Sequence, residues 1–128
     1  MLIQLLRVKI QQLIVSESSE NYPGSIALPD DLIEAAGLKL FEQVHVNNLT
    51  NGNRIITYVV RSKKDGVVTL NGAASKLFKK GDKIHVLAFG YFNEQNVSSC
   101  SGVVVGLACA STRPVMRSIT LRSSSRVG

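Results

Sequence analysis

The dipeptide Gly24-Ser25 is the part of the sequence whose residue types could carry out a covalent reaction on the chain itself. In a strained turn, the Ser25 hydroxyl oxygen can attack the Gly24 carbonyl carbon through a five-membered ring, which moves the acyl group from nitrogen to oxygen. Loss of the Ser25 α-proton would then cleave the chain, and hydrolysis of the resulting dehydroalanine would leave a pyruvoyl group. Taken alone, a Gly-Ser pair more often marks an ordinary turn, so the dipeptide needs support from the rest of the chain.

Other groups with catalytic chemistry are scarce. His45 and His85 lie in segments expected to be strands, where a solvated or hydrogen-bonded histidine is far more common than a catalytic one. The glycines are dispersed and form no phosphate-binding motif, which argues against a nucleotide cofactor. Cys100 and Cys109 lack the spacing of metal ligands, so we expect neither a metal site nor a disulfide framework.

Short strands separated by turns must position these residues. Apolar, β-rich or alternating segments predict strands at residues 3–15, 44–49, 54–61, 67–70 and 83–89. Asn51-Gly52 predicts a hairpin between the second and third of these strands, because both residues readily adopt positive φ. Two short helices are expected, one at residues 32–36 that ends at Gly37 and one at residues 73–80 that ends at Gly81. Many short strands with few helices favour a small closed β-barrel.

The composition is that of an ordinary globular domain. The chain has 128 residues, of which 45% are hydrophobic and 19% charged. The longest apolar stretch, residues 102–110, is too short to span a membrane, and Arg7 and Lys9 interrupt the apolar N-terminus, so a cytoplasmic location is expected.

Residues 93–128 are rich in serine and small residues without a clear period, and we expect a flexible tail with a strand at residues 103–107 as an alternative.

Six motifs that follow one another along the chain resemble those of bacterial aspartate 1-decarboxylase. They are Met1-Leu-Ile-Gln-Leu-Leu-Arg-Val-Lys9-Ile, Asn21-Tyr22-Pro-Gly24-Ser25-Ile, Ala35-Ala-Gly37, Asn51-Gly52-Asn-Arg54-Ile-Ile-Thr57-Tyr58, Asn71-Gly72-Ala73-Ala74 and Lys80-Gly81-Asp82-Lys83. The resemblance covers residue 1 to about residue 89. It implies a mainly β fold over residues 1–92, a six-stranded double-psi β-barrel with two or more short helices. It also implies a homotetramer whose inactive proenzyme cuts itself between Gly24 and Ser25.

The resemblance implies a reaction as well. Ser25 would become a covalent pyruvoyl cofactor, which forms a Schiff base with L-aspartate and accepts the electrons released when the α-carboxylate leaves as carbon dioxide. The product would be β-alanine, a precursor of pantothenate and coenzyme A.

Matching the motifs residue by residue assigns further roles. Lys9 and Arg54 would hold the two substrate carboxylates, and Tyr58 would be the proton donor. Thr57 would stabilise the oxyanion during cleavage and contact substrate. The remaining site residues would line the site or bind substrate at the start of the second helix: Tyr22, Asn71, Gly72, Ala73 and Ala74. Without the motifs, each would be an ordinary strand residue or part of a capped surface helix.

Two alternatives stay open. Relatives commonly have Lys-x-His-Arg where this chain has Lys9-Ile10-Gln11-Gln12, and Pro23 restricts the backbone before the cleavage point. Since a glutamine cannot carry a proton or a positive charge, an inactive, processing-defective member of the family is one alternative, and a separate maturation protein is a possible requirement. The second alternative is a basic β-barrel that binds nucleic acid, which the net charge of +6 permits. The scarcity of aromatic residues for base stacking argues against it.

Overall fold

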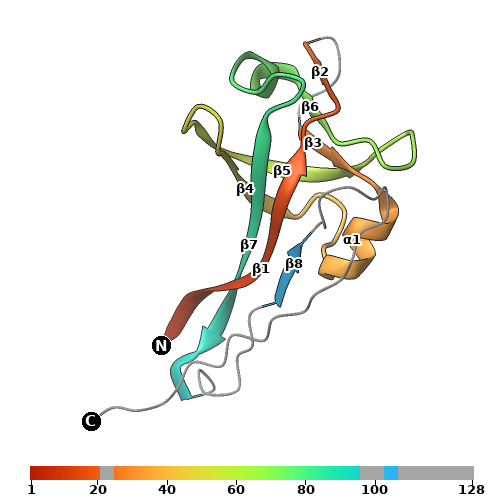
Figure 1. The fold of residues 1–128 in the computed structure, drawn as a ribbon. Coiled ribbons are helices and arrows are strands. Elements are labelled where there is room, and N and C mark those ends of the chain that lie inside the picture. The colour runs from red at the N-terminus through yellow and green to blue at the C-terminus, as the bar shows by residue number, and fades with distance from the viewer. Residues whose placement is uncertain (21–24, 96–102, 107–128) are drawn as a thin grey trace.

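The computed structural model describes residues 1–20, 25–95 and 103–106. Strands dominate this part of the chain, so the predicted mainly β fold is confirmed (Figure 1). In chain order the elements are β1 (Leu2–Ile14), β2 (Glu17–Ser19), β3 (Ser25–Leu28), α1 (Asp30–Ala36), β4 (Gln43–Asn48), β5 (Arg54–Arg61), β6 (Thr69–Asn71), the 3-10 helix η1 (Gly72–Lys76), β7 (Lys83–Asn93) and β8 (Val103–Gly106).

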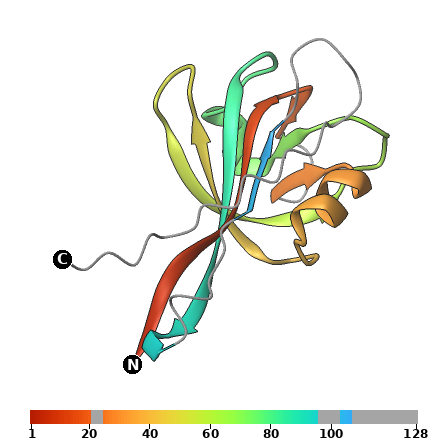
Figure 2. The same cartoon turned by 60° about the horizontal axis from the view of Figure 1, so that its bottom comes forward.

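The strands form one curled sheet in the order β2-β6-β3-β5-β4-β7-β1-β8 (Figures 1 and 2). Its six middle strands correspond in number to the predicted six-stranded barrel. The two short outer strands were not part of that expectation: β2 pairs in parallel with β6, and β8 pairs in parallel with β1. Within the described ranges no pairing joins β2 to β8, so the sheet is open rather than closed.

The strand β8 lies in the segment that was expected to be a flexible tail. It confirms the alternative of a strand near residues 103–107, because Val103–Gly106 pairs with residues 8–11 of β1. The strand β7 also continues to Asn93, past the expected boundary at residue 92. The remaining residues of the tail, including Cys100 and Cys109, lie outside the described residues.

The first helix follows its sequence signals. Asp30 and Asp31 occupy the first turn of α1, where carboxylates interact favourably with the free N–H groups. Gly37 ends the helix with φ of 66° and donates its N–H to the carbonyl of Glu34 at 3.1 Å. The prediction at residues 32–36 is therefore confirmed.

The second helix is shorter than predicted. Only Gly72–Lys76 is helical, with 3-10 geometry, whereas the sequence indicated residues 73–80. The chain turns after Lys76, and Phe78 enters the core with none of its side-chain surface exposed. Burial of this phenylalanine outweighs the local preference for about one more helical turn.

The core lies on the inner face of the sheet. Alternate residues of neighbouring strands point inward, and the fully buried side chains include Val8, Ile10, Leu13, Ile26, Val44, Val46, Val59, Leu70, Phe78, Ile84 and Val86. In β1 the alternation shifts between Ile10 and Leu13, where the pairing with β7 is irregular and Gln12 has φ of 60°. This bulge lets both Ile10 and Leu13 face the core although they are three residues apart.

Asn48 organises the turn between β4 and β5. Its side chain, 2% exposed, accepts the N–H groups of Thr50 and Asn51, and its amide donates to Asp82 Oδ2 at 2.8 Å and to the Leu77 carbonyl at 3.2 Å. Of the Asn51-Gly52 pair, Gly52 alone has positive φ, 80°. The predicted hairpin between β4 and β5 is confirmed by their antiparallel pairing, but its turn has one positive φ value and not two, because Asn48 supports a wider turn.

Asp82 makes the fold sensitive to acid. The Lys79 backbone N–H and the Asn48 side-chain amide both donate to its carboxylate and lower the pKa of that group. A lowered folded-state pKa stabilises the protein above the unfolded carboxyl pKa of about 3.9, and this stability is lost as pH falls through the folded value. We expect Asp82→Asn to unfold at lower urea concentration at neutral pH and to lose less stability on acidification than the unsubstituted protein. Urea unfolding at neutral and acidic pH measures both effects.

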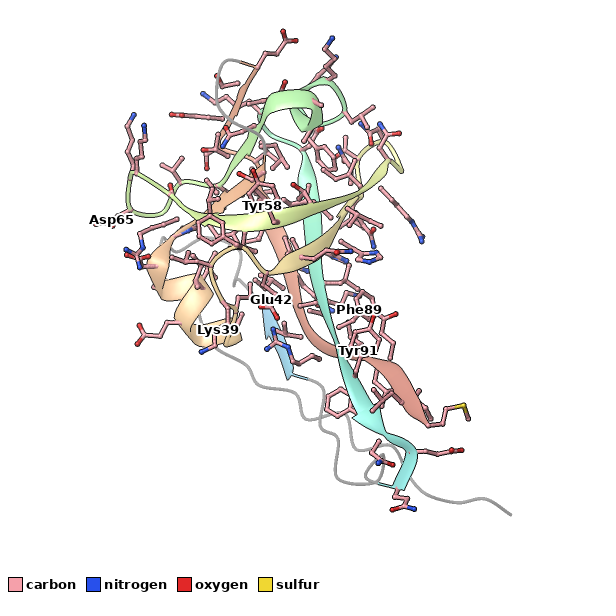
Figure 3. The ribbon with its side chains drawn as sticks, turned by 180° about the vertical axis from the view of Figure 1, so that it is seen from behind. Lys39, Glu42, Tyr58, Asp65, Phe89 and Tyr91 are labelled. Carbon is pink, nitrogen blue, oxygen red and sulfur yellow. The ribbon has the colours of Figure 1, made fainter. Side chains whose placement is uncertain are left out.

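Asp65 offers a matched control for that substitution. It lies exposed in the loop between β5 and β6 (Figure 3), apart from the turn between β4 and β5 that Asn48 organises. Asp65→Asn should keep the acid sensitivity of the unsubstituted chain. An Asp82→Asn protein with that same acid sensitivity would contradict the assignment.

Candidate active site

Ser25 is the first residue of β3 and is held in an unusual conformation. Its φ is 120°, a region that residues with a side chain rarely occupy, and the residue is 3% exposed. Within the described part of the chain its hydroxyl oxygen is buried without a hydrogen-bond partner. A strained residue with a buried, unpartnered hydroxyl fits the nucleophile expected at this position. Tyr22, Pro23 and Gly24 lie outside the described residues.

The strand register brings Asn71 and Tyr58 to the two sides of Ser25. Asn71 of β6 pairs directly with Ser25, and Ile26 of β3 pairs with Val59 of the parallel strand β5. Because β3 and β5 run parallel, the residues just before this pair, Ser25 and Tyr58, also lie side by side. Asn71 is 4% exposed, and its Oδ1 is also buried without a hydrogen-bond partner among the described residues. The strands thus align three polar side chains across one face of the sheet.

These three residues line a cavity of about 530 Å³. The other lining residues are Glu17, Ser19, Ala27, Phe41, Val60, Arg61, Ser62, Lys63, Lys64, Val67 and Thr69. Three of them are cationic and one is anionic. Two exposed ion pairs involve these residues, with Lys64 Nζ at 3.8 Å from Glu17 Oε1 and Arg61 Nε at 2.6 Å from Asp30 Oδ1. With Asp30 included, the charged groups at the cavity carry a net charge of +1, which favours an anionic ligand.

The basic wall of this cavity, formed by Arg61, Lys63 and Lys64, was not predicted from the sequence. The only signal was the run Arg61-Ser62-Lys63-Lys64 at the end of a predicted strand. Such a run is common on protein surfaces, and only the fold places it beside Ser25.

Tyr58 lines the Ser25 cavity and a neighbouring hollow, whereas Thr57 lines only the neighbouring hollow. Tyr58 is 40% exposed, and its ring centroid lies 6.4 Å from that of Phe41. Thr57 pairs with Val44 and lines a second, more open hollow of about 600 Å³, together with Phe41, Gln43, Ile56 and Tyr58. Thr57 does not line the Ser25 cavity, so one chain alone does not bring the expected oxyanion-stabilising residue to that cavity.

The segment after Asn71 lies next to the cavity rather than in its wall. Gly72, with φ of 62°, Ala73 and Ala74 begin η1, and Asn71 makes no side-chain cap at its start. Among the residues 71–74, Asn71 is the one that lines the cavity. The role of the three small residues stays a prediction.

Lys9 and Arg54 are not brought to Ser25 within one chain. Lys9 on β1 pairs with Leu87, Leu87 with His45, and His45 with Ile56 of β5. With β3 beyond β5, Lys9 and Ser25 are four strand spacings apart, about 19 Å along the sheet. Arg54 precedes Tyr58 by four residues, about 13 Å along β5. Neither cation lines the cavity.

Lys9 instead lies near His85. Partial burial lowers the pKa of His85, and the positive charge of Lys9 lowers it further. Gln11 pairs with Gly106 of β8, and Gln12 forms the bulge in β1, so both glutamines lie on the same strand as Lys9 and apart from the cavity.

Among the described residues, no helix is long and apolar enough to cross a membrane. No group of three or more His, Cys, Asp and Glu side chains is placed there to hold a metal ion.

Comparison with known proteins gives a consistent result. A sequence profile described as aspartate decarboxylase matches residues 1–111, which extends beyond the motifs that end near residue 89. The chain is 44% identical over 98 residues to aspartate 1-decarboxylase of Stenotrophomonas maltophilia strain K279a, covering 76% of this chain and 78% of the relative. It is 39% identical over 103 residues to the protein of that name from Campylobacter jejuni strain 81116, covering 80% and 82%. The protein of that name from Fervidobacterium nodosum is 40% identical over 96 residues, covering 74% and 83%.

Proposed function

Because the chain belongs to the aspartate decarboxylase family, whose members are carboxy-lyases, we propose that it converts L-aspartate to β-alanine and carbon dioxide after cleaving itself between Gly24 and Ser25. The conformation and burial of Ser25 are the main support for this proposal. Ser25 combines a left-handed φ, burial and an unpartnered hydroxyl at the wall of a basic cavity. In the cytoplasm the product would supply pantothenate and coenzyme A synthesis.

The cleavage chemistry follows from the Ser25 hydroxyl. Its oxygen attacks the Gly24 carbonyl carbon, a C–O bond forms, and the C–N bond to Ser25 breaks, which leaves an ester and a free amine. Removal of the Ser25 α-proton breaks the Cβ–O bond, and Gly24 leaves as a carboxylate. Hydrolysis of the remaining dehydroalanine releases ammonia and leaves a pyruvoyl group at the new N-terminus. The strained φ of Ser25 raises the energy of the uncleaved chain and so favours the first step.

Asn71 is positioned to assist that first step. It lies directly across the strand pair from Ser25, and its Oδ1 lacks a hydrogen-bond partner among the described residues, as the Ser25 hydroxyl does. We propose that Asn71 accepts the hydroxyl hydrogen and so orients the oxygen toward the preceding carbonyl. This role deepens the expected supporting role of Asn71.

The residues around Ser25 fit a pyruvoyl group formed from it. When present, that group supplies an electrophilic carbonyl that binds the substrate amine and accepts the electron pair of the breaking carboxylate bond. Tyr58 lies beside Ser25 and lines the same cavity, which supports the proposal that it delivers a proton to the substrate carbon. The cavity cations attract an anionic substrate such as a dicarboxylate.

The positions of Lys9 and Arg54 support the expected homotetramer. The family motifs assign both to the substrate carboxylates, yet neither lines the Ser25 cavity of its own chain. We propose that a neighbouring copy of the chain supplies them, so that each site combines residues from two subunits.

Mixed oligomers test this shared site. Ser25→Ala and Lys9→Ala proteins should each be poorly active, and chains of both kinds assembled together should recover about a quarter of the unsubstituted activity, because random neighbours restore some sites. The measurement is carbon dioxide release after co-expression. Ser25→Ala assembled with the Ser25→Ala/Lys9→Ala double variant is the matched control and should recover nothing. Lack of recovery in the first mixture would mean that Lys9 acts within its own chain or not at all.

The intact mass of the purified chain under denaturing conditions tests the proposed function first. We expect two fragments, one that ends at Gly24 and one that begins with a pyruvoyl group, together with carbon dioxide release from L-aspartate. Fragments that form on warming the pure protein would show that no maturation protein is required. A chain that stays intact after warming and releases no carbon dioxide would support the processing-defective alternative instead.

A further inference from the structure

The connection between α1 and β4 contains a tight turn with an unfavourable residue at its centre. The Glu42 N–H donates to the Lys39 carbonyl at 3.1 Å, which makes Leu40 and Phe41 the two central residues. Phe41 has φ of 67°, and Leu40 is not among the residues with positive φ. A turn with positive φ only at its third residue is of type II, where glycine or asparagine is preferred. A phenylalanine there is a backbone outlier.

Bonds that do not involve the Phe41 side chain fix this turn. The Glu42 carboxylate accepts the Lys39 N–H at 2.9 Å and the Arg7 guanidinium, and Lys39 and Glu42 lie close together in Figure 3. The Phe41 N–H donates to the Val59 carbonyl at 2.7 Å, and the Val59 N–H donates to the Glu42 carbonyl at 3.1 Å. A glycine or asparagine at position 41 could make the same backbone bonds with less strain. The phenylalanine is therefore not needed to build the turn.

Core packing does not explain the residue either. Phe41 is 73% exposed, so its ring gains little from burial. Its ring centroid lies 6.4 Å from that of Tyr58 with an interplanar angle of 41°, within the range of interacting aromatic pairs. Phe41 also lines both the Ser25 cavity and the neighbouring hollow, and Tyr58 is the other residue that lines both.

We infer that Phe41 is a positioning residue for Tyr58. Its ring covers one side of the Tyr58 ring where the two hollows meet, restricts the rotation of the phenol and keeps it directed toward the Ser25 cavity. The strained turn is retained because it projects an aromatic side chain to this point. This inference rests on the proposed function, in which Tyr58 delivers a proton.

The Phe41→Asn variant separates this role from a structural one. Asparagine tolerates the left-handed conformation, so the variant should unfold at a higher urea concentration than the unsubstituted protein and should be cleaved normally. Its kcat for aspartate should fall about three- to tenfold, with KM changed by less than about twofold, since a lost aromatic contact affects proton delivery more than substrate binding. Phe41→Tyr should restore kcat, and Leu40→Asn in the same turn should leave it unchanged. An unchanged kcat in Phe41→Asn, or a rise in KM alone, would overturn the inference.

Tyrosine fluorescence provides a readout that does not depend on activity. The chain has no tryptophan and three tyrosines, so a Tyr22→Phe/Tyr91→Phe background leaves Tyr58 as the emitter. Adding Phe41→Asn should increase quenching of this emission by acrylamide, because the Tyr58 ring loses its cover. If the unsubstituted protein is neither cleaved nor active, the proposed function fails while this test still reports on the aromatic contact. Equal quenching with and without Phe41 would show that the contact does not hold Tyr58.

Discussion

The Ser25→Ala protein should remain one uncleaved chain and release no measurable carbon dioxide from L-aspartate. Alanine removes the only oxygen that can attack the Gly24 carbonyl from this residue, so neither the ester nor the pyruvoyl group can form. We expect the loss of activity to exceed about 10⁴-fold, as for the removal of other covalent nucleophiles. Intact mass and carbon dioxide release measure the two effects.

Unfolding should not explain that loss. The Ser25 hydroxyl is buried and has no hydrogen-bond partner in the described structure, so its removal eliminates an unsatisfied polar group and should not lower the free energy of unfolding. Ser19→Ala is the matched control, because Ser19 lines the same cavity from β2. It should be cleaved and active like the unsubstituted chain. Fragments from the Ser25→Ala protein with the same masses as before would contradict the assigned nucleophile.

The Tyr58→Phe protein should separate cleavage from decarboxylation. The ring and its contact with Phe41 are kept, and only the phenolic hydroxyl is lost. Processing into two fragments should therefore proceed, whereas kcat for aspartate should fall about 10²- to 10⁴-fold, the usual contribution of a positioned proton donor. The assay is carbon dioxide release by protein whose complete cleavage has been verified by mass.

Tyr91 supplies the control for that substitution. It lies on the projecting part of β7, well away from Tyr58 on β5 (Figure 3), and is 72% exposed. Tyr91→Phe should leave both cleavage and kcat unchanged. A Tyr58→Phe protein with full kcat would mean that water or another group delivers the proton.

Local signals predicted the elements whose structure depends on nearby residues. The strand at residues 54–61 was predicted at its observed bounds, and the helix that ends at Gly37 was also confirmed. The predicted end of the second helix was wrong because that end depends on burial of Phe78. The strands β2 and β3 were missed because each is a short strand that pairs with a distant segment, and β8 was expected only as an alternative to a flexible tail. Sequence periodicity contains no information about such pairing partners.

In the candidate site, too, features that depend on local motifs were predicted, and features that depend on distant parts of the chain were not. Ser25 and Tyr58 were proposed from motifs, and the strand register places them side by side. The role of Phe41 could not have been predicted from the sequence, because its left-handed φ occurs in a turn that Glu42 and Arg7 fix. Arg7 lies 35 residues before Glu42 in the chain. The separation of Lys9 from the cavity was equally hidden, since it follows from the order of the strands and not from spacing along the chain.

The parallel pairing of β8 with β1 has a consequence for solubility. An outer strand with free N–H and C=O groups is a template on which another chain can add, and this is a common route to aggregation. Residues 103–106 cover that edge along residues 8–11 of β1, beside some of the most apolar sequence in the sheet. A chain shortened before residue 103 would expose this edge while keeping Ser25, Tyr58 and the whole cavity. With β8 in place, the edge at this end of the sheet is a four-residue strand, a shorter template than β1, so residues 103–106 would limit self-association without contributing to the chemistry.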